Sequence, residues 1–398
     1  MTTYNFDKIT DRRGTNCLKY DYAVERGKPA DVLPLWVADM DFTVSEEITK
    51  SLHAAVEHGI YGYTQPKESY YNAVMNWMEK NHNWKTKREW IVKTPGVVFA
   101  LGAAVRAFTD PGDAVLIQNP VYYPFTNIVR DNDRKVVDNT LVYEKTSARK
   151  NGYRIDFEDF ECKIEQEHIK LFILCNPHNP VGRVWTREEL QQLGEICLRH
   201  HVIVVSDEIH NDFVYPGYEH TVFATVDPRF AEFTVTCTAP SKTFNLAGLQ
   251  ISHIFISNEK MREAFRKEID KTGYDEPNAL GTVACEAAYR GGEEWLEQLR
   301  AYLLQNLNFL RTYLQEKLSK IHLVEPEGTY LVWLDCSELG ISGEELDQFI
   351  VEKAGLWLDG GSMFGPSGVN FQRVNIACPR ATLELALDKL KTAVDSLK

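Results

Sequence analysis

Short apolar runs rich in β-branched residues recur through the middle of the chain, and polar or turn-forming residues separate them. They lie at Ala114–Gln118, Lys135–Val142, Ile169–Cys175, Val202–Ser206, Phe233–Thr238 and Ile251–Ser257. Runs of this length and composition predict β-strands, and their nearly continuous apolar character indicates burial on both faces. Such strands are typical of a parallel sheet rather than of a hairpin with one solvated face.

Amphipathic stretches long enough for helices lie between several of these strands. They are Val97–Thr109, Thr186–His201 and Asn258–Lys271. Thr186 with Glu188 and Glu189 provides a polar cap and acidic residues at the positive end of the second helix. Alternating strands and helices predict an α/β fold in which helices cover a mostly parallel sheet.

The pattern of alternating strands and helices changes near residue 279. A long helical region, Ala279–Leu318, has a predicted break at Gly291-Gly292. Further elements follow at Thr329–Asp335 (strand), Gly343–Ala354 (helix), Arg373–Ala377 (strand) and from Arg380 onward (helix). We therefore expect a large domain over residues 45–278, a smaller α+β domain over 279–398, and an N-terminal segment, 1–44, that packs with the smaller domain.

Composition narrows the possible functions. The 398 residues carry 44 basic and 57 acidic side chains, a net charge of −13, which argues against a general nucleic-acid partner. No apolar stretch of about 18 residues or more predicts a membrane span, and residues 1–9 lack the apolar core of a signal peptide. Eight scattered cysteines without a CxxC pair indicate reduced thiols, so we expect a cytoplasmic protein without a structural metal site.

Polar side chains follow four of the predicted strands at the point where each strand ends. They are Tyr122, Asn179, Asp207 and Lys242. Ligands of open parallel sheets bind outside the carboxyl ends of the strands, so we expect these side chains to converge on one rim. Each has an ordinary interpretation too: a turn asparagine, a cap or ion-pair aspartate, a solvated lysine and a packing tyrosine. Their ordered appearance at successive strand ends favours a site.

The order Tyr122, Asn179, Asp207, Ser241-Lys242, Arg373 is similar to that of fold-type-I pyridoxal-phosphate enzymes of the aminotransferase class I/II superfamily. More narrowly, four segments resemble the MalY/PatB subfamily of cystathionine β-lyases. They are Trp36–Phe42, Gly62–Thr64, Ser206–His210 and Ser241–Asn245. The resemblance spans nearly the whole chain and implies a large domain with helices on both faces of its sheet, plus the smaller α+β domain.

The resemblance assigns cofactor-binding roles to the residues at the strand ends. Lys242 would bind the aldehyde of pyridoxal 5′-phosphate covalently and later move a proton at the substrate Cα. Asp207 would pair with the pyridine nitrogen, Asn179 would hydrogen-bond the ring oxygen, and Tyr122 would stack on the ring. His210 stands where many superfamily members have a tyrosine that also reaches the ring oxygen.

The phosphate group needs backbone donors at a helix start. The amides of Val97 and Val98, at the start of a predicted helix, and the hydroxyl of Ser241 are the candidates. Tyr63 matches a family tyrosine that reaches the phosphate from the neighbouring subunit and that also becomes a catalytic candidate here. That match implies a homodimer with shared active sites.

A small amino-acid substrate is implied as well. Arg373 matches the arginine that holds the substrate α-carboxylate, although a surface ion pair is its ordinary interpretation. Asn179, Val37 and Ala38 are the other candidates for substrate binding. Either Tyr63 or Tyr122 would assist the leaving thiolate, and the sequence leaves that choice open.

Two positions depart from the aminotransferase pattern. Gln250 stands where many superfamily members carry a phosphate-contacting arginine, and His210 replaces the tyrosine after Asp207. Both departures are similar to the β-lyase subfamily. They favour a C–S β-lyase that converts L-cystathionine or a related S-substituted L-cysteine to a thiol, pyruvate and ammonia. A class I/II aminotransferase, and a cofactor-bound regulatory protein, remain the alternatives.

Overall fold

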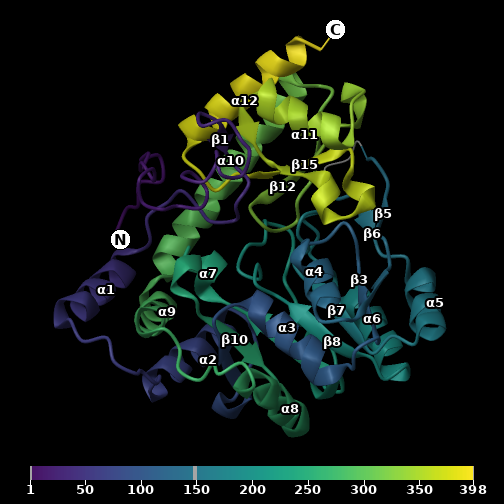
Figure 1. Ribbon diagram of the computed structural model, residues 1–398. Coiled ribbons are helices and arrows are strands. Elements are labelled where there is room, and N and C mark those ends of the chain that lie inside the picture. Colours follow the sequence, from purple (N-terminus) through teal and green to yellow (C-terminus); the bar gives the residue numbers. More distant parts are fainter. Residues whose placement is uncertain (1, 147–149, 398) are drawn as a thin grey trace.

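A seven-stranded sheet forms the centre of the larger part of the molecule in the computed structural model, which describes residues 2–146 and 150–397 (Figure 1). Its strand order is β2-β10-β9-β8-β7-β3-β4. In that order the strands are Ile91–Thr94, Ser252–Phe255, Thr234–Thr238, Ile203–Asp207, Leu171–Cys175, Ala114–Ile117 and Lys135–Asp138. Strands β9, β8, β7, β3 and β4 pair in parallel, whereas β10 is antiparallel to both of its neighbours.

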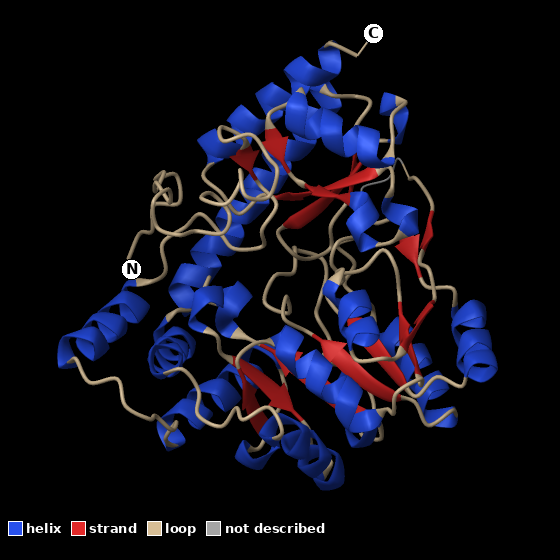
Figure 2. Cartoon of the chain, viewed as in Figure 1, coloured by secondary structure: helices blue, strands red, loops and turns tan. Residues whose placement is uncertain are grey.

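Helices cover both faces of this sheet, as Figure 2 shows in blue and red. One face packs against α3 (Val97–Phe108), α4 (Pro124–Asp131) and α8 (Glu259–Asp270). The other packs against α5 (Phe157–Glu167) and α6 (Arg187–Arg199). Successive residues of β3 and β7 alternate between these two cores, which is why both strands are apolar at every position. The predicted α/β fold is confirmed.

Helix α6 begins as the sequence predicts, with Thr186 as its N-cap. The amide of Glu189 donates to the Thr186 hydroxyl at 3.2 Å, and the Thr186 amide donates to the Glu189 carboxylate at 2.9 Å. This reciprocal capping box satisfies two amides that the helix itself leaves without partners.

One strand prediction in this sheet needs correction, and one strand was missed. Lys135–Val142 is not one strand, because β4 ends at Asp138 and the short β5 (Val142–Tyr143) pairs instead with β6 (Tyr153–Arg154). The Leu141 amide between them donates to the Asn119 carbonyl and draws the chain away from the sheet. Strand β2 was not predicted, because only Ile91 and Val92 of its four residues are apolar and two residues show no periodicity.

A four-stranded antiparallel sheet with the order β11-β12-β15-β14 forms the centre of the C-terminal part. Its strands are His322–Val324, Leu331–Asp335, Phe371–Asn375 and Asp359–Gly360, and its helices are α11 (Gly343–Glu352) and α12 (Arg380–Asp395). The predicted strand at Arg373–Ala377 begins two residues earlier, at Phe371. The domain boundaries at 44 and 278 stay a prediction.

The two helices α9 (Ala279–Gly291) and α10 (Glu293–Lys317) meet at Gly292, within the predicted break at Gly291-Gly292. Figure 1 shows α10 running from α9 toward α12. A Cβ atom at Gly292 would lie 2.5 Å from Cε1 of Phe244 and 2.6 Å from the Ala288 carbonyl oxygen. Only glycine fits this junction without displacing the Phe244 ring.

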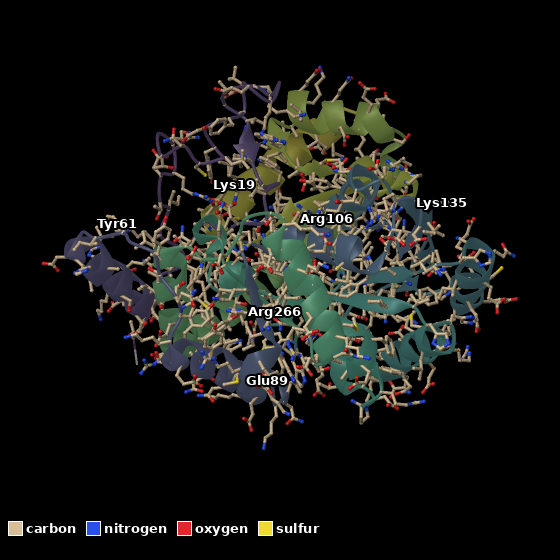
Figure 3. All side chains as sticks on the ribbon, turned by 60° about the horizontal axis from the view of Figure 1, so that its bottom comes forward. Lys19, Tyr61, Glu89, Arg106, Lys135 and Arg266 are labelled. Atoms are coloured by element: carbon tan, nitrogen blue, oxygen red, sulfur yellow. The ribbon has the colours of Figure 1, made fainter. Side chains whose placement is uncertain are left out.

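The N-terminal segment runs alongside the C-terminal part. Strand β1 (Leu33–Pro34) pairs in parallel with β13 (Leu356–Trp357). The Lys19 side chain, labelled in the upper part of Figure 3, is fully buried and donates to Asp41 at 2.9 Å. The helices α1 (Glu46–His58) and α2 (Glu68–His82) then pack against α9. None of the helices in the described residues is long and apolar enough to cross a membrane.

Candidate active site

A cavity of about 180 Å³ opens at the carboxyl ends of the parallel strands. Such an edge is where ligands bind in sheets of this type. Its walls come from four regions: the segment before α1, the start of α3, the loops after β3, β7 and β8, and the short helix α7 (Pro240–Thr243). The lining residues are Ala38, Pro95, Gly96, Val97, Val98, Tyr122, Cys175, Asn179, Asp207, Ile209, His210, Ser241, Lys242, Ala247 and Ile251.

Lys242 lies on α7, which begins two residues after β9 ends. The pKa of its ammonium group is lowered to about 8, chiefly by burial and in part by the Arg373 cation, while Asp39 and Asp207 act in the opposite direction. A lysine with a pKa this close to neutrality has an appreciable fraction of free amine, which is the nucleophilic and basic form. Lys242 is therefore suited to covalent bond formation and to proton transfer.

Asp207 is the last residue of β8 and is 4% exposed. Burial raises the pKa of its carboxyl group to about 7, and neighbouring Glu208 adds to the rise. The Ile209 amide, which donates to Asp207 Oδ1 at 3.1 Å, and the Lys242 cation lower the pKa only in part. The carboxylate therefore lacks a full complement of compensating charge, as expected of a group that receives a cationic ligand.

Asn179 and Arg373 join the two sheets at the edge of the cavity. Arg373, on β15 and 3% exposed, donates from Nη1 to Asn179 Oδ1 at 3.0 Å and from Nη2 to the Trp36 carbonyl at 2.9 Å. It also forms an ion pair with Asp359. Its buried Nε has no hydrogen-bond partner among the described residues. A buried donor of this kind is costly unless a ligand accepts from it.

Tyr122, His210 and Ser241 complete the polar lining at the strand ends. The Tyr122 amide donates to the Asn179 carbonyl at 3.0 Å, and burial raises the pKa of the Tyr122 phenol. Burial lowers the pKa of His210 well below its usual value, so its imidazole is neutral near pH 7. Within the described part of the chain, His210 Nδ1 is buried without a partner.

The first turn of α3 forms another wall of the cavity. Gly96 is its N-cap, and Val97 and Val98 are its first two residues. The amides of a first helical turn have no partner within the helix and carry its positive end. These amides are therefore suited to bind a phosphate group.

The segment before α1 is held against the cavity through its main chain. The Tyr330 hydroxyl donates to the Ala38 carbonyl at 2.7 Å, and Asn375 Nδ2 donates to the Val37 carbonyl at 2.6 Å. Of the four predicted substrate-binding residues, Ala38 and Asn179 are among the described lining residues, whereas Val37 and Arg373 are not.

Tyr63 is not brought to the cavity by its own chain. Its side chain is 95% exposed, and the neighbouring Ile60 and Tyr61 are exposed too. Figure 3 shows Tyr61 at the periphery of the molecule, near α1. Gln250 is also exposed and is not among the described lining residues, although it stands eight residues after Lys242.

Sequence reasoning missed several residues of this site. Cys175 ends β7 and its sulfur accepts from the Asn179 amide at 3.4 Å, so its place at a strand end was an available signal. Asp359 had no such signal, because β14 has only two residues. The remaining unpredicted lining residues are Pro95, Gly96, Ile209, Ala247 and Ile251.

The donor set fits pyridoxal phosphate, the cofactor implied by the resemblance. An amine with a lowered pKa and an under-compensated carboxylate lie in one cavity, together with a free helix N-terminus. The unpartnered polar atoms of His210 and Arg373 are what a bound polar ligand would satisfy.

Comparisons with known proteins agree with this geometry. The model of the family aminotransferase class I and II matches residues 30–390. The cystathionine β-lyase PatB of Bacillus subtilis is 46% identical over 390 residues, which cover 98% of this chain and 100% of that protein. Cystalysin from Treponema denticola, a structure that contains pyridoxal 5′-phosphate, has a TM-score of 0.95 at 37% identity and full coverage of both chains. The C–S lyase from Staphylococcus hominis, with the same cofactor bound, has a TM-score of 0.91 at 35% identity, covering 99% of this chain and 98% of that one.

Proposed function

The chain belongs to the aminotransferase class I and II family, and from that premise we propose that it is a pyridoxal-phosphate-dependent C–S β-lyase. Its substrate would be L-cystathionine or a related S-substituted L-cysteine, and its products a thiol (homocysteine from cystathionine), pyruvate and ammonia. The observation that carries the proposal is the presence of Lys242 and the buried Asp207 in one cavity of a chain that is 46% identical to a cystathionine β-lyase.

Lys242 is proposed as both the cofactor-binding residue and the base. When bound, the cofactor supplies an electron-withdrawing ring that stabilises negative charge at the substrate Cα. The free Lys242 amine would accept the substrate Cα proton, and its lowered pKa supports that role. The electrons left at Cα would break the Cβ–S bond, and the thiolate would take up a proton and leave as the thiol. One water molecule would then hydrolyse the remaining three-carbon fragment to pyruvate and ammonia.

Asp207 is proposed to hold a proton on the pyridine nitrogen. A cation at that nitrogen would favour the charged form of the carboxyl group and so lower its raised pKa. Asn179 and His210 are proposed to face the ring oxygen, and Tyr122 the ring. The amides of Val97 and Val98, with the hydroxyl of Ser241, are proposed to bind the phosphate.

Arg373 is proposed to bind the substrate α-carboxylate. Its Nε is a buried donor without a partner among the described residues, and its Nη1 already contacts Asn179. A carboxylate at this place would accept from Nε and bring the substrate Cα toward Lys242. Ala38, and Val37 through its main chain, are proposed to line the same end of the substrate.

The assembly and the location are proposed from the exposed apolar side chains and from the cysteines. The exposed apolar side chains at Ile60, Tyr61 and Tyr63 support a homodimer in which Tyr63 enters the partner's cavity. In that position Tyr63, like Tyr122, is a candidate to assist the leaving thiolate. The eight free cysteines support a reducing, cytoplasmic location.

The decisive experiment is product analysis with purified enzyme and L-cystathionine. A β-lyase releases pyruvate with no keto acid added, whereas an aminotransferase needs a keto acid acceptor. Lys242→Ala is the matched control and should release no pyruvate above background. Borohydride treatment of the wild-type holoenzyme should fix the cofactor on Lys242, and mass mapping of the adduct to another lysine would contradict the assignment.

A further inference from the structure

A cluster of polar side chains lies behind the strand ends and outside the cavity. We call His82, Glu208, Asp212, His220 and Thr243 the back cluster. Glu208, Asp212 and Thr243 are almost completely buried, as are the side chains of the two histidines. None of the five is among the described residues that line the active-site cavity. Burying polar groups costs free energy unless they are hydrogen-bonded, so the contacts of these five side chains indicate what the cluster holds in place.

One half of the back cluster ties the helix of Lys242 to its surroundings through Asp212. The Thr243 hydroxyl, one residue after Lys242, donates to Asp212 Oδ2 at 2.6 Å. His82 Nε2, at the end of α2, is 3.1 Å from Asp212 Oδ1. Trp77 Nε1 donates to both carboxylate oxygens at 3.3 Å, and Arg300 Nε on α10 donates to the Asp212 carbonyl at 2.6 Å. Asp212 thus connects α7 with α2 and α10.

The other half holds the strand end that carries Asp207. Glu208, one residue later, accepts from the Ser206 hydroxyl at 2.9 Å and from the Phe223 amide at 3.0 Å. Its second oxygen is 3.0 Å from His220 Nε2. The rings of His82 and His220 meet edge to face with centroids 5.7 Å apart, so the two halves are in contact.

We propose that Asp212 and Thr243 are positioning residues that fix the Lys242 amine relative to the Asp207 carboxylate. The proposal rests on the assignment of Lys242 and Asp207 as cofactor-binding residues. Each of those two residues is adjacent in sequence to a member of the back cluster, so its side chain enters the cavity while its neighbour is anchored behind it.

The length of α7 explains why this anchor matters. Four residues form a single turn, which is too short to be stable by its own hydrogen bonds. A hydrogen bond to a charged acceptor is about twice as strong as a neutral one, so the Thr243–Asp212 contact is a strong restraint on α7. Without it, the turn that carries Lys242 is free to shift, and proton transfer is sensitive to displacements of a fraction of an ångström.

Thr243→Val is the most direct test, because it removes the hydroxyl and nearly preserves the shape. Thr243→Ser restores the hydroxyl. Thr236→Val is the matched control: Thr236 is a buried threonine of β9 whose hydroxyl has no partner in the described part of the chain. Asp212→Asn, which removes the charge, provides a second route to the same contact.

The measurements use holoenzyme: kcat and KM for pyruvate release from cystathionine, and the pH midpoint of the visible absorption of the lysine-bound cofactor. The charged groups that act on Lys242 are Asp39, Asp207 and Arg373, and none of these variants alters them. We expect Thr243→Val to lower kcat about tenfold with KM nearly unchanged and to displace the absorption midpoint. Thr243→Ser should return both toward wild type, and Thr236→Val should change neither.

The proposal is overturned if Thr243→Val behaves like Thr236→Val in both measurements. It is also overturned if Thr243→Val and Asp212→Asn lose activity only in step with thermal stability while the absorption midpoint stays at the wild-type value. Failure of the proposed function would look different, because the wild-type enzyme itself would then release no pyruvate from cystathionine or would carry no cofactor on Lys242.

Discussion

Two buried aspartates five residues apart, Asp207 and Asp212, experience opposite environments. They are 4% and 3% exposed, and burial acts to raise the pKa of both. At Asp207 that effect wins and the pKa rises to about 7. At Asp212, hydrogen bonds from His82 and Thr243 and the charge of Arg300 outweigh burial, and the pKa is lowered. Equal burial therefore does not imply equal chemistry.

The difference separates a group that is prepared for a ligand from one that is part of the framework. Asp212 has its donors within the protein, so its ionised form is favoured whether or not a ligand is bound. The Asp207 carboxylate accepts from one amide, so its ionisation costs free energy unless a cationic ligand lies beside it. An under-compensated carboxylate beside a lysine of lowered pKa is the pattern of a functional site.

Of the substitutions that test this comparison, replacing Asp207 should have the largest effect on catalysis. Asp207→Asn removes the anion that would hold a proton on the cofactor ring, so we expect kcat for pyruvate release to fall about 10³-fold, equivalent to about 4 kcal/mol. Steady-state kinetics at saturating cofactor measures this loss. A variant within tenfold of wild type would show that ring protonation does not depend on Asp207.

The raised pKa of Asp207 also predicts a pH dependence of stability in the cofactor-free protein. An unfolded aspartate titrates near 3.9, so between about pH 4 and pH 7 the folded chain binds more protons at this residue than the unfolded chain does. The contribution of Asp207 to the unfolding free energy should therefore fall by about 3 kcal/mol as pH rises from 4 to 7.

Denaturant titrations of wild type and Asp207→Asn across that pH range isolate this contribution. The difference in unfolding free energy between the two proteins should grow in favour of the variant as pH increases. A constant difference would mean that the folded-state pKa of Asp207 is not raised.

Asp212 should behave in the opposite way, with its main effect on stability. Asp212→Ala leaves the Thr243 hydroxyl and the Trp77 indole without their acceptor, so we expect the unfolding free energy to fall by about 2 to 3 kcal/mol. Denaturant titration at pH 7 on cofactor-free protein measures the loss. Asp207→Ala under the same conditions is the control and should cost less, because it removes a carboxylate that is itself costly to bury.

The smallest effect is expected from His82→Gln. The glutamine amide can still donate to Asp212, so the carboxylate would retain a hydrogen bond from this position and lose only the fixed geometry of the imidazole donor, which lies 3.1 Å away. We expect a loss of about 1 kcal/mol in unfolding free energy at pH 7. A loss as large as that of Asp212→Ala would mean that His82, rather than the whole donor set, keeps Asp212 ionised.

The regular elements were predictable where the pattern extended over enough residues. The runs at β3 and β7 are apolar at every position because both faces of the sheet are covered, whereas β9 is equally buried but alternates threonines with Val235 and Cys237. The break between α9 and α10 was visible as a glycine pair. Strand β2, by contrast, has four residues and is placed in the sheet by pairing with β10, which is distant in sequence.

The site was predictable to the extent that it depends on strand ends. Asp207 ends a strand, Lys242, Asn179 and Tyr122 each follow one, and the structure brings all four to one cavity. Asp359 meets Arg373 through the pairing of β14 with β15, and no local signal in the sequence announces that pairing. The roles of these residues stay predictions until the variants are measured.

The junction at Gly292 has a mechanical consequence. Helix α10 spans 25 residues from that glycine to the four-stranded sheet, a rigid arm of about 37 Å. A rotation of about 5° at such a pivot moves the far end by about 3 Å, the length of a hydrogen bond. The pivot rests against the ring of Phe244, two residues beyond Lys242. A rotation of α10 about Gly292 would therefore act on the segment that carries Lys242.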